Sequence, residues 1–309
     1  MRKTFIETII NLAETDKNIY LLTGDLGFSI FKGFAEKFPK RFINCGIAEQ
    51  NMMGVAAGLA IEGKKPYVYS IAPFVTMRCF EQIRNDICYQ NLNVKIIGMG
   101  AGFSYGADDF THYAIEDLSI LKSLPNLMLL SPADLIETKE LVLQSYSKKQ
   151  PTYIRLDKSG KMMHNGRSKI IIGKPFVFKD GKNAVLITTG TCLEIGISVA
   201  KKLESEGFSL KIISMHTIKP IDEKLLVKET QGQKIVFTLE EHSVAGGLGS
   251  SVAEILLENH IKNITFEKLG VPDDHKNIIG KQSYLKKHYG IDEAIVYRKI
   301  FNAIKTNEK

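Results

Sequence analysis

The sequence predicts an α/β fold of two domains, each built on a parallel sheet with helices on both of its faces. Two observations carry this prediction. Short apolar runs alternate with amphipathic segments of helical length along most of the 309 residues, a pattern typical of strands buried on both faces. A polar, Lys- and Gly-rich stretch, DKSGKMMHNGRSKIIIGK, interrupts the alternation at residues 157–174. We therefore expect a first domain of residues 1–165 and a smaller second domain of residues 166–309.

In the first domain, an amphipathic helix over residues 1–17 precedes apolar strand runs that start at residues 18, 41, 65, 92, 127 and 151. Helices are expected from Glu49 to about residue 63, and over 74–90, 115–125 and 135–148. Asp134 is the expected N-cap of the last of these, because its carboxylate can accept a backbone N–H of the first turn. In the second domain, strand runs start at residues 183, 208 and 233, and helices are expected over 192–207, 222–230 and 247–260.

The composition narrows the functional class. The net charge is +7, and the basic residues are scattered, so we expect mild attraction for anionic metabolites and neither a nucleic-acid nor a membrane partner. Four cysteines form no C-x-x-C pair, which indicates a reducing compartment and no zinc site. Glu7, Asn11 and Glu14 interrupt any signal-peptide core, and no apolar run is long enough to span a membrane. The expected location is cytoplasmic.

Ligands of open α/β sheets bind beyond the carboxyl ends of the strands. The polar, Gly-rich segments at these positions are GDLGFS, GIAEQN, GMGAGFSYGADDFTH, RLDKSG and EEHSVAGG. In the third, Asp108, Asp109, Thr111 and His112 share one loop, and such clusters line ligand crevices more often than single polar residues do.

Glu49 opens a helix of unusually small residues, GVAAGLA at 54–60. An acid in a first turn can simply complement the helix dipole, which contributes about 0.3–1 kcal/mol. Glycines, however, cost helix propensity and are useful only where another backbone comes close. We therefore expect a closely packed helix at a subunit contact, with a carboxyl held away from water at its mouth. Phe74, Met77 and Phe80 recur at helical spacing and are either a core face or the wall of a site for a planar ligand.

Three segments in this order, GIAEQNMMGVAAGLA, THYAIEDLSILKSLPNLMLLSPAD and LEEHSVAGGLGSSVAE, resemble the C-terminal half of the transketolase family. The split transketolases and the deoxyxylulose-phosphate synthases are the most similar variants, and the resemblance covers about residues 3 to 300. It implies that the first domain is the pyrimidine-binding domain of a thiamine-diphosphate enzyme and that the second is the transketolase C-terminal domain.

The resemblance also implies roles for single residues. Glu49 would hydrogen-bond N1′ of the aminopyrimidine ring, with Phe74 and Phe80 flanking the ring and Met77 in place of a stacking Phe. Asp25 would brace the cofactor site across a dimer. The implied substrate-contacting residues are Ser29 at the entrance, Asp108, His112, which would also act in catalysis, and Arg155 as the phosphate-binding residue.

Two departures from the family pattern matter. The GDG…N motif that binds Mg²⁺ and the diphosphate is missing, and KDGKN near residue 180 is too short to replace it. We therefore expect a partner subunit that carries this motif, assembled with the present chain as a dimer of heterodimers. The family's second phosphate anchor would fall at Gly100 or Ala101, neither of which binds an anion by its side chain. The phosphate is then held differently, or the sugar is unphosphorylated or nucleotide-linked.

The expected activity is transfer of a two-carbon ketol unit between sugars by thiamine diphosphate and Mg²⁺. Three alternatives stay open at this point. They are the β subunit of a 2-oxo acid dehydrogenase's decarboxylating component, an enzyme like deoxyxylulose-phosphate synthase, and a paralogue with no catalytic activity.

Overall fold

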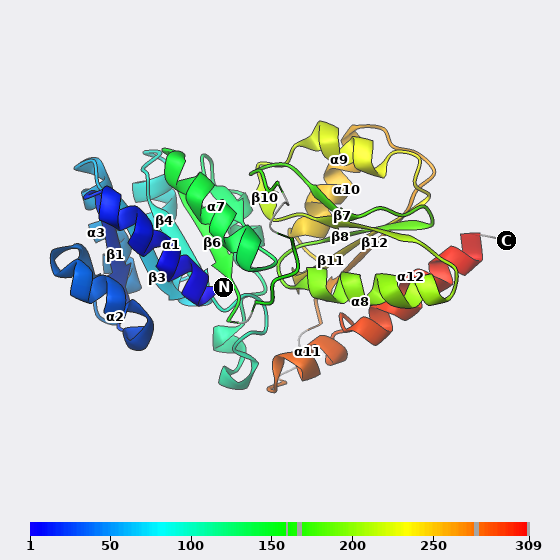
Figure 1. Cartoon of the computed structure of the whole chain (residues 1–309), viewed down its shortest axis with the longest axis horizontal. Helices are drawn as coiled ribbons and strands as arrows, with labels where there is room; N and C mark the ends of the chain where they lie inside the picture. The colour runs from blue at the N-terminus through cyan, green and yellow to red at the C-terminus, as the bar shows by residue number, and fades with distance from the viewer. Residues whose placement is uncertain (159, 166–168, 275–277, 308–309) are drawn as a thin grey trace.

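The computed structural model describes residues 1–158, 160–165, 169–274 and 278–307, which form two sheets lying side by side with helices around each (Figure 1). The first sheet has the strand order β10-β5-β6-β4-β3-β1-β2, and all its pairs are parallel except β10 with β5. Its strands are β1 (Ile19–Thr23), β2 (Phe42–Asn44), β3 (Lys65–Ile71), β4 (Lys95–Met99), β5 (Met128–Leu130), β6 (Thr152–Leu156) and β10 (Thr217–Lys219).

Helices cover both faces of the first sheet. Phe5, Phe31 and Leu141 belong to one apolar cluster, which packs α1, α2 and α7 onto one face. Met52 and Leu118 belong to a second cluster, which packs α3, η2 and α6 onto the other face. The helices of this half are α1 (Arg2–Thr15), α2 (Phe28–Lys37), α3 (Glu49–Ile61), α4 (Ala72–Thr76), α5 (Phe80–Gln82), the π-helix η2 (Ile83–Cys88), α6 (Asp117–Lys122) and α7 (Leu135–Ser147), with short 3-10 turns η1 (Pro39–Arg41), η3 (Gly106–Asp108) and η4 (Phe110–His112).

The second sheet has the order β12-β11-β8-β9-β7, with only β7 antiparallel to its neighbour. Its strands are β7 (Phe176–Lys179), β8 (Ala184–Thr188), β9 (Leu210–Ser214), β11 (Ile235–Ser243) and β12 (Thr265–Val271). Its helices are α8 (Cys192–Ser205), α9 (Glu223–Thr230), α10 (Leu248–Glu258), α11 (Gln282–His288) and α12 (Glu293–Asn307). The cluster under α3 continues through Ile218 and Val185 to Val252 of α10, so one apolar core runs through both halves.

The predicted α/β class, with alternating strands and helices, is confirmed, and Asp134 caps α7 by accepting the backbone N–H of Glu137 at 2.8 Å. In the second half, β7, β12, α11 and α12 are elements that the sequence analysis does not predict. Three further features differ from expectation. Residues 74–90 do not form one helix but break into α4, α5 and η2. The strand β10, from the second half of the chain, joins the first sheet and covers the edge of β5. Each sheet is mixed, because β10 and β7 run antiparallel to their neighbours.

The expected domain boundary between residues 165 and 166 adjoins residues 166–168, which lie outside the described residues. It therefore stays a prediction. Across the part of the chain that the structure describes, we find no helix that combines the length and the apolar character needed to cross a bilayer.

The topology gathers the polar loops at one edge of the first sheet. Parallel strands end at the same edge, and β1, β2, β3, β4 and β6 are all parallel to one another. The segments that follow these strands begin with Gly24, Cys45, Ala72, Gly100 and Asp157. The candidate site is therefore built at this carboxyl edge.

Candidate active site

Glu49 is the first residue of α3 and is only 1% exposed. Its Oε1 accepts a hydrogen bond from Ser70 Oγ of β3 at 3.2 Å, and its Oε2 lies 2.6 Å from Nη1 of Arg78. The backbone of Gly24 closes a further side, since a Cβ atom there would lie 3.4 Å from Oε1. The carboxyl thus sits in a dry pocket at a helix N-terminus, where the helix dipole favours negative charge.

Arg78 is a site residue that the sequence analysis missed. It lies in the break between α4 and α5, and its side chain is 43% exposed. The guanidinium carbon lies 4.4 Å from the centroid of the Phe74 ring, so Arg78 stacks on Phe74 while it pairs with Glu49. A basic residue shortly after the end of β3 is the signal that could have found it, but the helical spacing of residues 74–90 hid the break.

Phe74 connects this acid to the loop after β4. Its ring centroid lies 5.0 Å from that of His112, edge to face, and the His112 Nδ1 atom lies 2.9 Å from Thr111 Oγ1. The centroid of the Tyr105 ring is also 6.0 Å from that of the imidazole. Glu49, Phe74 and His112, three of the predicted residues, are therefore brought together along the carboxyl edge.

Four other predicted residues, Asp25, Met77, Phe80 and Asp108, differ from one another in exposure and in their contacts. Asp108 is exposed at the end of η3. Asp25 adopts a φ of 56° and its Oδ1 accepts the side-chain N–H of Asn44 at 2.9 Å. Met77 is partly exposed, and Phe80 packs on the core cluster beneath α3, which agrees with the interpretation of that position as a core face. Their roles toward a cofactor or substrate stay predictions.

Arg155 does not lie where a phosphate-binding residue is expected. It is 2% exposed, and its Nε donates to Asp117 Oδ2 at 2.9 Å. Its Nη2 donates to the backbone oxygens of Ala114 and of Glu241, the latter at 3.0 Å. This buried guanidinium joins β6 to β11 of the second half, so its surroundings do not support the expectation that it binds a substrate phosphate.

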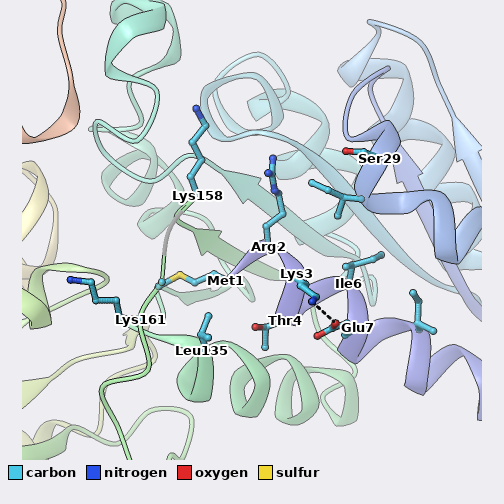
Figure 2. Close-up of a pocket in the computed structure, with 13 residues that line it drawn as sticks. Met1, Arg2, Lys3, Thr4, Ile6, Glu7, Ser29, Leu135, Lys158 and Lys161 are labelled. Atoms are coloured by element: carbon cyan, nitrogen blue, oxygen red, sulfur yellow. Dashed lines mark ion pairs between the residues drawn. The ribbon is translucent and has the colours of Figure 1, made fainter.

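A basic cavity of about 940 Å³ opens at the same edge, between the first turns of α1 and α2 and the segment after β6 (Figure 2). Arg2, Lys158, Lys161 and Ser29 line it, and Figure 2 shows the Arg2 and Lys158 side chains extending toward the same side. The Lys158 ammonium lies 3.7 Å from the centroid of the Tyr105 ring, which places this cavity beside the His112 loop. Lys158 is thus the cation of RLDKSG that remains accessible at the edge.

An aminopyrimidine ring, which the resemblance implies at Glu49, fits the chemistry of these residues. A buried carboxylate offers an acceptor to a ring N–H, and Phe74 offers an aromatic face to the group that pairs with this carboxylate. The Arg78 guanidinium, itself a planar group with N–H donors, already makes both kinds of contact. It donates to Glu49 at 2.6 Å and lies 4.4 Å from the centroid of the Phe74 ring. Among the described residues, no three His, Cys, Asp or Glu side chains gather closely enough to hold a metal ion.

Comparison with known proteins places both halves of the chain. The family model described as the transketolase pyrimidine-binding domain matches residues 1–161, and that of the transketolase C-terminal domain matches residues 173–296. A putative transketolase C-terminal section of Methanocaldococcus jannaschii is 36% identical, covering 99% of this chain and 96% of that protein. One subunit of the apulose-4-phosphate transketolase of Phocaeicola vulgatus is 33% identical, covering 94% and 93%. A 6-deoxy-6-sulfo-D-fructose transketolase subunit of a Clostridium species is 31% identical, covering 96% and 92%.

Solved transketolase structures have the same fold as this chain. A split-gene transketolase, described as an inactive β4 tetramer, has a TM-score of 0.87 and 38% identity over 98% of this chain and 97% of that one. The transketolase of Campylobacter jejuni has a TM-score of 0.81 at 18% identity, and this chain covers 46% of it. That second likeness shows the fold alone, with this chain spanning about half of the longer protein.

Proposed function

The chain belongs to the transketolase family, and from that premise we propose that it is the C-terminal subunit of a two-subunit enzyme that transfers a two-carbon ketol unit between sugars with thiamine diphosphate. The observation that carries the proposal is the buried Glu49 at the mouth of α3, which Arg78 links to Phe74, whose ring in turn contacts His112. A carboxyl kept from water next to an aromatic face has the chemistry that an aminopyrimidine ring requires. Relatives of matching length are named as single subunits or sections of transketolases, which supports the split architecture.

Each residue then has a role that its surroundings suit. Glu49 holds a proton at the ring N1′, and its dry pocket keeps water from competing for the carboxylate. Phe74 contacts the ring, and His112 hydrogen-bonds the sugar oxygens from the loop after β4. When bound, the cofactor supplies the electron sink that breaking a bond next to a carbonyl needs.

The anionic end of the sugar binds in the basic cavity rather than at Arg155. Lys158 and Arg2 provide accessible cations there, and cationic clefts attract phosphate and sulfonate groups alike. Two relatives are named for a sugar phosphate and a sulfo sugar, so both named substrates carry an anionic group. We propose a short anionic sugar as the substrate. Of the two alternatives left open by the sequence, this is the one in which the phosphate is held by residues other than Gly100 and Ala101.

The partner subunit carries the Mg²⁺ and the diphosphate site, and two copies of each subunit form a heterotetramer. The outer face of α3 supports the contact with a second copy. A Cβ atom at Gly54 or Gly58 would meet nothing within 4 Å, and the flanking Ile47 and Ile61 are 79% and 61% exposed. A helix face of this kind allows a close approach by another backbone. The split-gene relative is described as an inactive β4 tetramer, which supports contacts between copies of this subunit and does not test the heterotetramer.

The test is turnover of the assembled complex. Glu49→Gln should lower turnover with a ketose-phosphate donor and an aldose acceptor by about 100-fold or more, with assembly unchanged. Glu62→Gln is the matched control, because Glu62 is an exposed acid at the other end of the same helix. Full activity of Glu49→Gln would contradict the proposal.

The donor distinguishes the enzyme classes. Deoxyxylulose-phosphate synthases are 32–34% identical over 94–98% of this chain, although the chain covers only 46–48% of their length. Pyruvate should therefore be offered beside the ketose. Turnover with pyruvate and no turnover with ketoses would favour that synthase, whereas acyl transfer to a lipoyl group would favour a 2-oxo acid dehydrogenase.

A further inference from the structure

Arg78 covers the accessible side of Glu49. The carboxyl is enclosed by Ser70 at one oxygen and by the backbone of Gly24. At its other oxygen the partner is the Arg78 Nη1, at 2.6 Å. Glu49 is buried, while the Arg78 side chain is 43% exposed. A group that approaches Oε2 from outside the protein therefore meets the guanidinium first.

The guanidinium also has the shape and bonding of the ring that is proposed to bind there. It is flat and delocalised, donates N–H bonds to a carboxylate, and stacks on aromatic faces. Arg78 uses both properties at once, because it donates to Glu49 and lies 4.4 Å from the centroid of Phe74. An aminopyrimidine is likewise a flat group with N–H donors and a face for stacking. Two such groups cannot occupy Oε2 and the same region of Phe74 together.

We propose that Arg78 is an internal stand-in for the aminopyrimidine ring: in the chain alone it occupies the ring's place at Glu49 and Phe74, and it leaves when the ring binds. The inference rests on the proposed function. It gives Arg78 a positioning role, since a buried carboxylate without a partner is costly and the guanidinium holds Glu49 in place until the ring replaces it. The break between α4 and α5 puts Arg78 on a turn, and its exposed side chain has solvent to move into.

Competition of this kind lowers the apparent affinity of the free chain for the ring. A ligand whose site is open only a fraction of the time binds more weakly by that fraction. If the ion pair is closed nine-tenths of the time or more, removing Arg78 raises the affinity by about tenfold or more.

The experiment is calorimetric titration of the isolated chain with thiamine, which carries the pyrimidine without the diphosphate and so tests this chain without its partner. Arg78→Ala should bind thiamine about tenfold more tightly than the unchanged chain. Arg84→Ala is the matched control, because Arg84 lies in η2 with its Nη1 bonded to neighbouring Asn85, and it should bind as the unchanged chain does. Equal or weaker binding by Arg78→Ala, or no binding by any variant, would overturn the inference.

Thermal unfolding of the same variants gives a second readout. Arg78→Ala should lower the midpoint by several degrees, because Glu49 is left buried without a cation. Adding Glu49→Gln should restore most of that loss, and thiamine should raise the midpoint of Arg78→Ala more than that of the unchanged chain. Additive effects of the two substitutions would show that the pair is not coupled and would refute the stand-in.

A third variant covers the case in which Arg78→Ala fails to fold. Arg78→Lys keeps a cation for Glu49 but lacks the flat stacking face, so it should fold and bind thiamine more tightly than the unchanged chain. Unchanged affinity in Arg78→Lys would contradict the inference. These outcomes are separate from the proposed function, which fails only if the assembled complex shows no ketol transfer or if Glu49→Gln leaves it intact.

Discussion

Replacing Arg155 by Met separates a structural arginine from a substrate-binding one. The substitution keeps the length and the apolar stem of the side chain but removes all of its N–H donors. Asp117 then keeps Tyr153 Oη, at 2.6 Å, as a donor, and the carbonyl oxygens of Ala114 and Glu241 each lose an N–H partner. Because these groups are buried, the loss is not compensated by water.

The magnitude follows from this geometry. Removing one member of a buried ion pair costs about 3–5 kcal/mol. The N–H donors lost by the two carbonyl oxygens add to this cost, although the Ala114 oxygen keeps the Gly102 N–H at 3.1 Å. We expect the free energy of unfolding to fall by about 4 kcal/mol, which lowers the thermal midpoint by roughly 6 °C for a chain of 309 residues. Calorimetric or urea unfolding of the purified chain measures this, with Lys158→Met as the control that should unfold as the unchanged chain does.

Activity of the complex completes the comparison. Lys158→Met should raise KM for the anionic sugar by about tenfold, because it removes one charge-assisted contact, and should leave KM for a neutral analogue unchanged. Arg155→Met, assayed below its unfolding midpoint, should leave both values close to those of the unchanged enzyme. A fully stable Arg155→Met protein with a KM raised only for the anionic sugar would refute our assignment and restore Arg155 as the anion-binding residue.

Three further outcomes follow. Gly54→Leu and Gly58→Leu should keep the stability of the subunit, since a Cβ atom there is unopposed, but should abolish its self-association in sedimentation experiments; intact oligomers would contradict the proposed α3 contact. Burial lowers the pKa of His242 to about 4, and its Nε2 accepts the Ser119 N–H at 3.3 Å. The unfolded chain takes up this proton near pH 6.5 and the folded chain only near pH 4, so stability falls as the pH drops through this range, by about 2 kcal/mol between pH 7 and about pH 5. A His242→Gln variant should show a smaller loss in urea unfolding, and an equal loss would show that another group is responsible. Gly98→Ala should destabilise the chain by about 1–3 kcal/mol, because its Cβ would lie 2.4 Å from Tyr153 Oη; unchanged thermal unfolding would show that β4 has room to shift.

The six parallel strands of the first sheet could be predicted because a short apolar run marks each of them, which is a local property of the sequence. Glu49 could also be found from a local pattern. An acid in front of a helix rich in Gly and Ala violates the local rules for a stable surface helix, and such violations are expected at functional sites. The break at residues 77–79 could not be found, because Phe74, Met77 and Phe80 keep helical spacing across it. Arg78 was hidden by that break.

The choice between Arg155 and Lys158 was beyond the sequence for another reason. The two lie three residues apart, and β6 ends between them at Leu156. Strand ends are uncertain by a few residues in any interpretation of sequence, yet this end decides which cation is enclosed by α6 and β11 and which one reaches the cavity. The pairing of β10 with β5 could not be predicted from the sequence either. It joins segments far apart in the chain, and nothing in the local pattern of one segment indicates the other as its partner.

That pairing limits how the chain can be recombined. A chimera that takes the pyrimidine half from one relative and the remainder from another also imports a foreign edge strand into the first sheet, at Thr217–Lys219. Ile218 is buried in the shared core, so a donor with a polar or bulkier residue there would disturb α6 and β5 rather than its own half. A cut between the two sheets therefore leaves the first fragment without its edge strand, and the second with an apolar strand that has lost its cover.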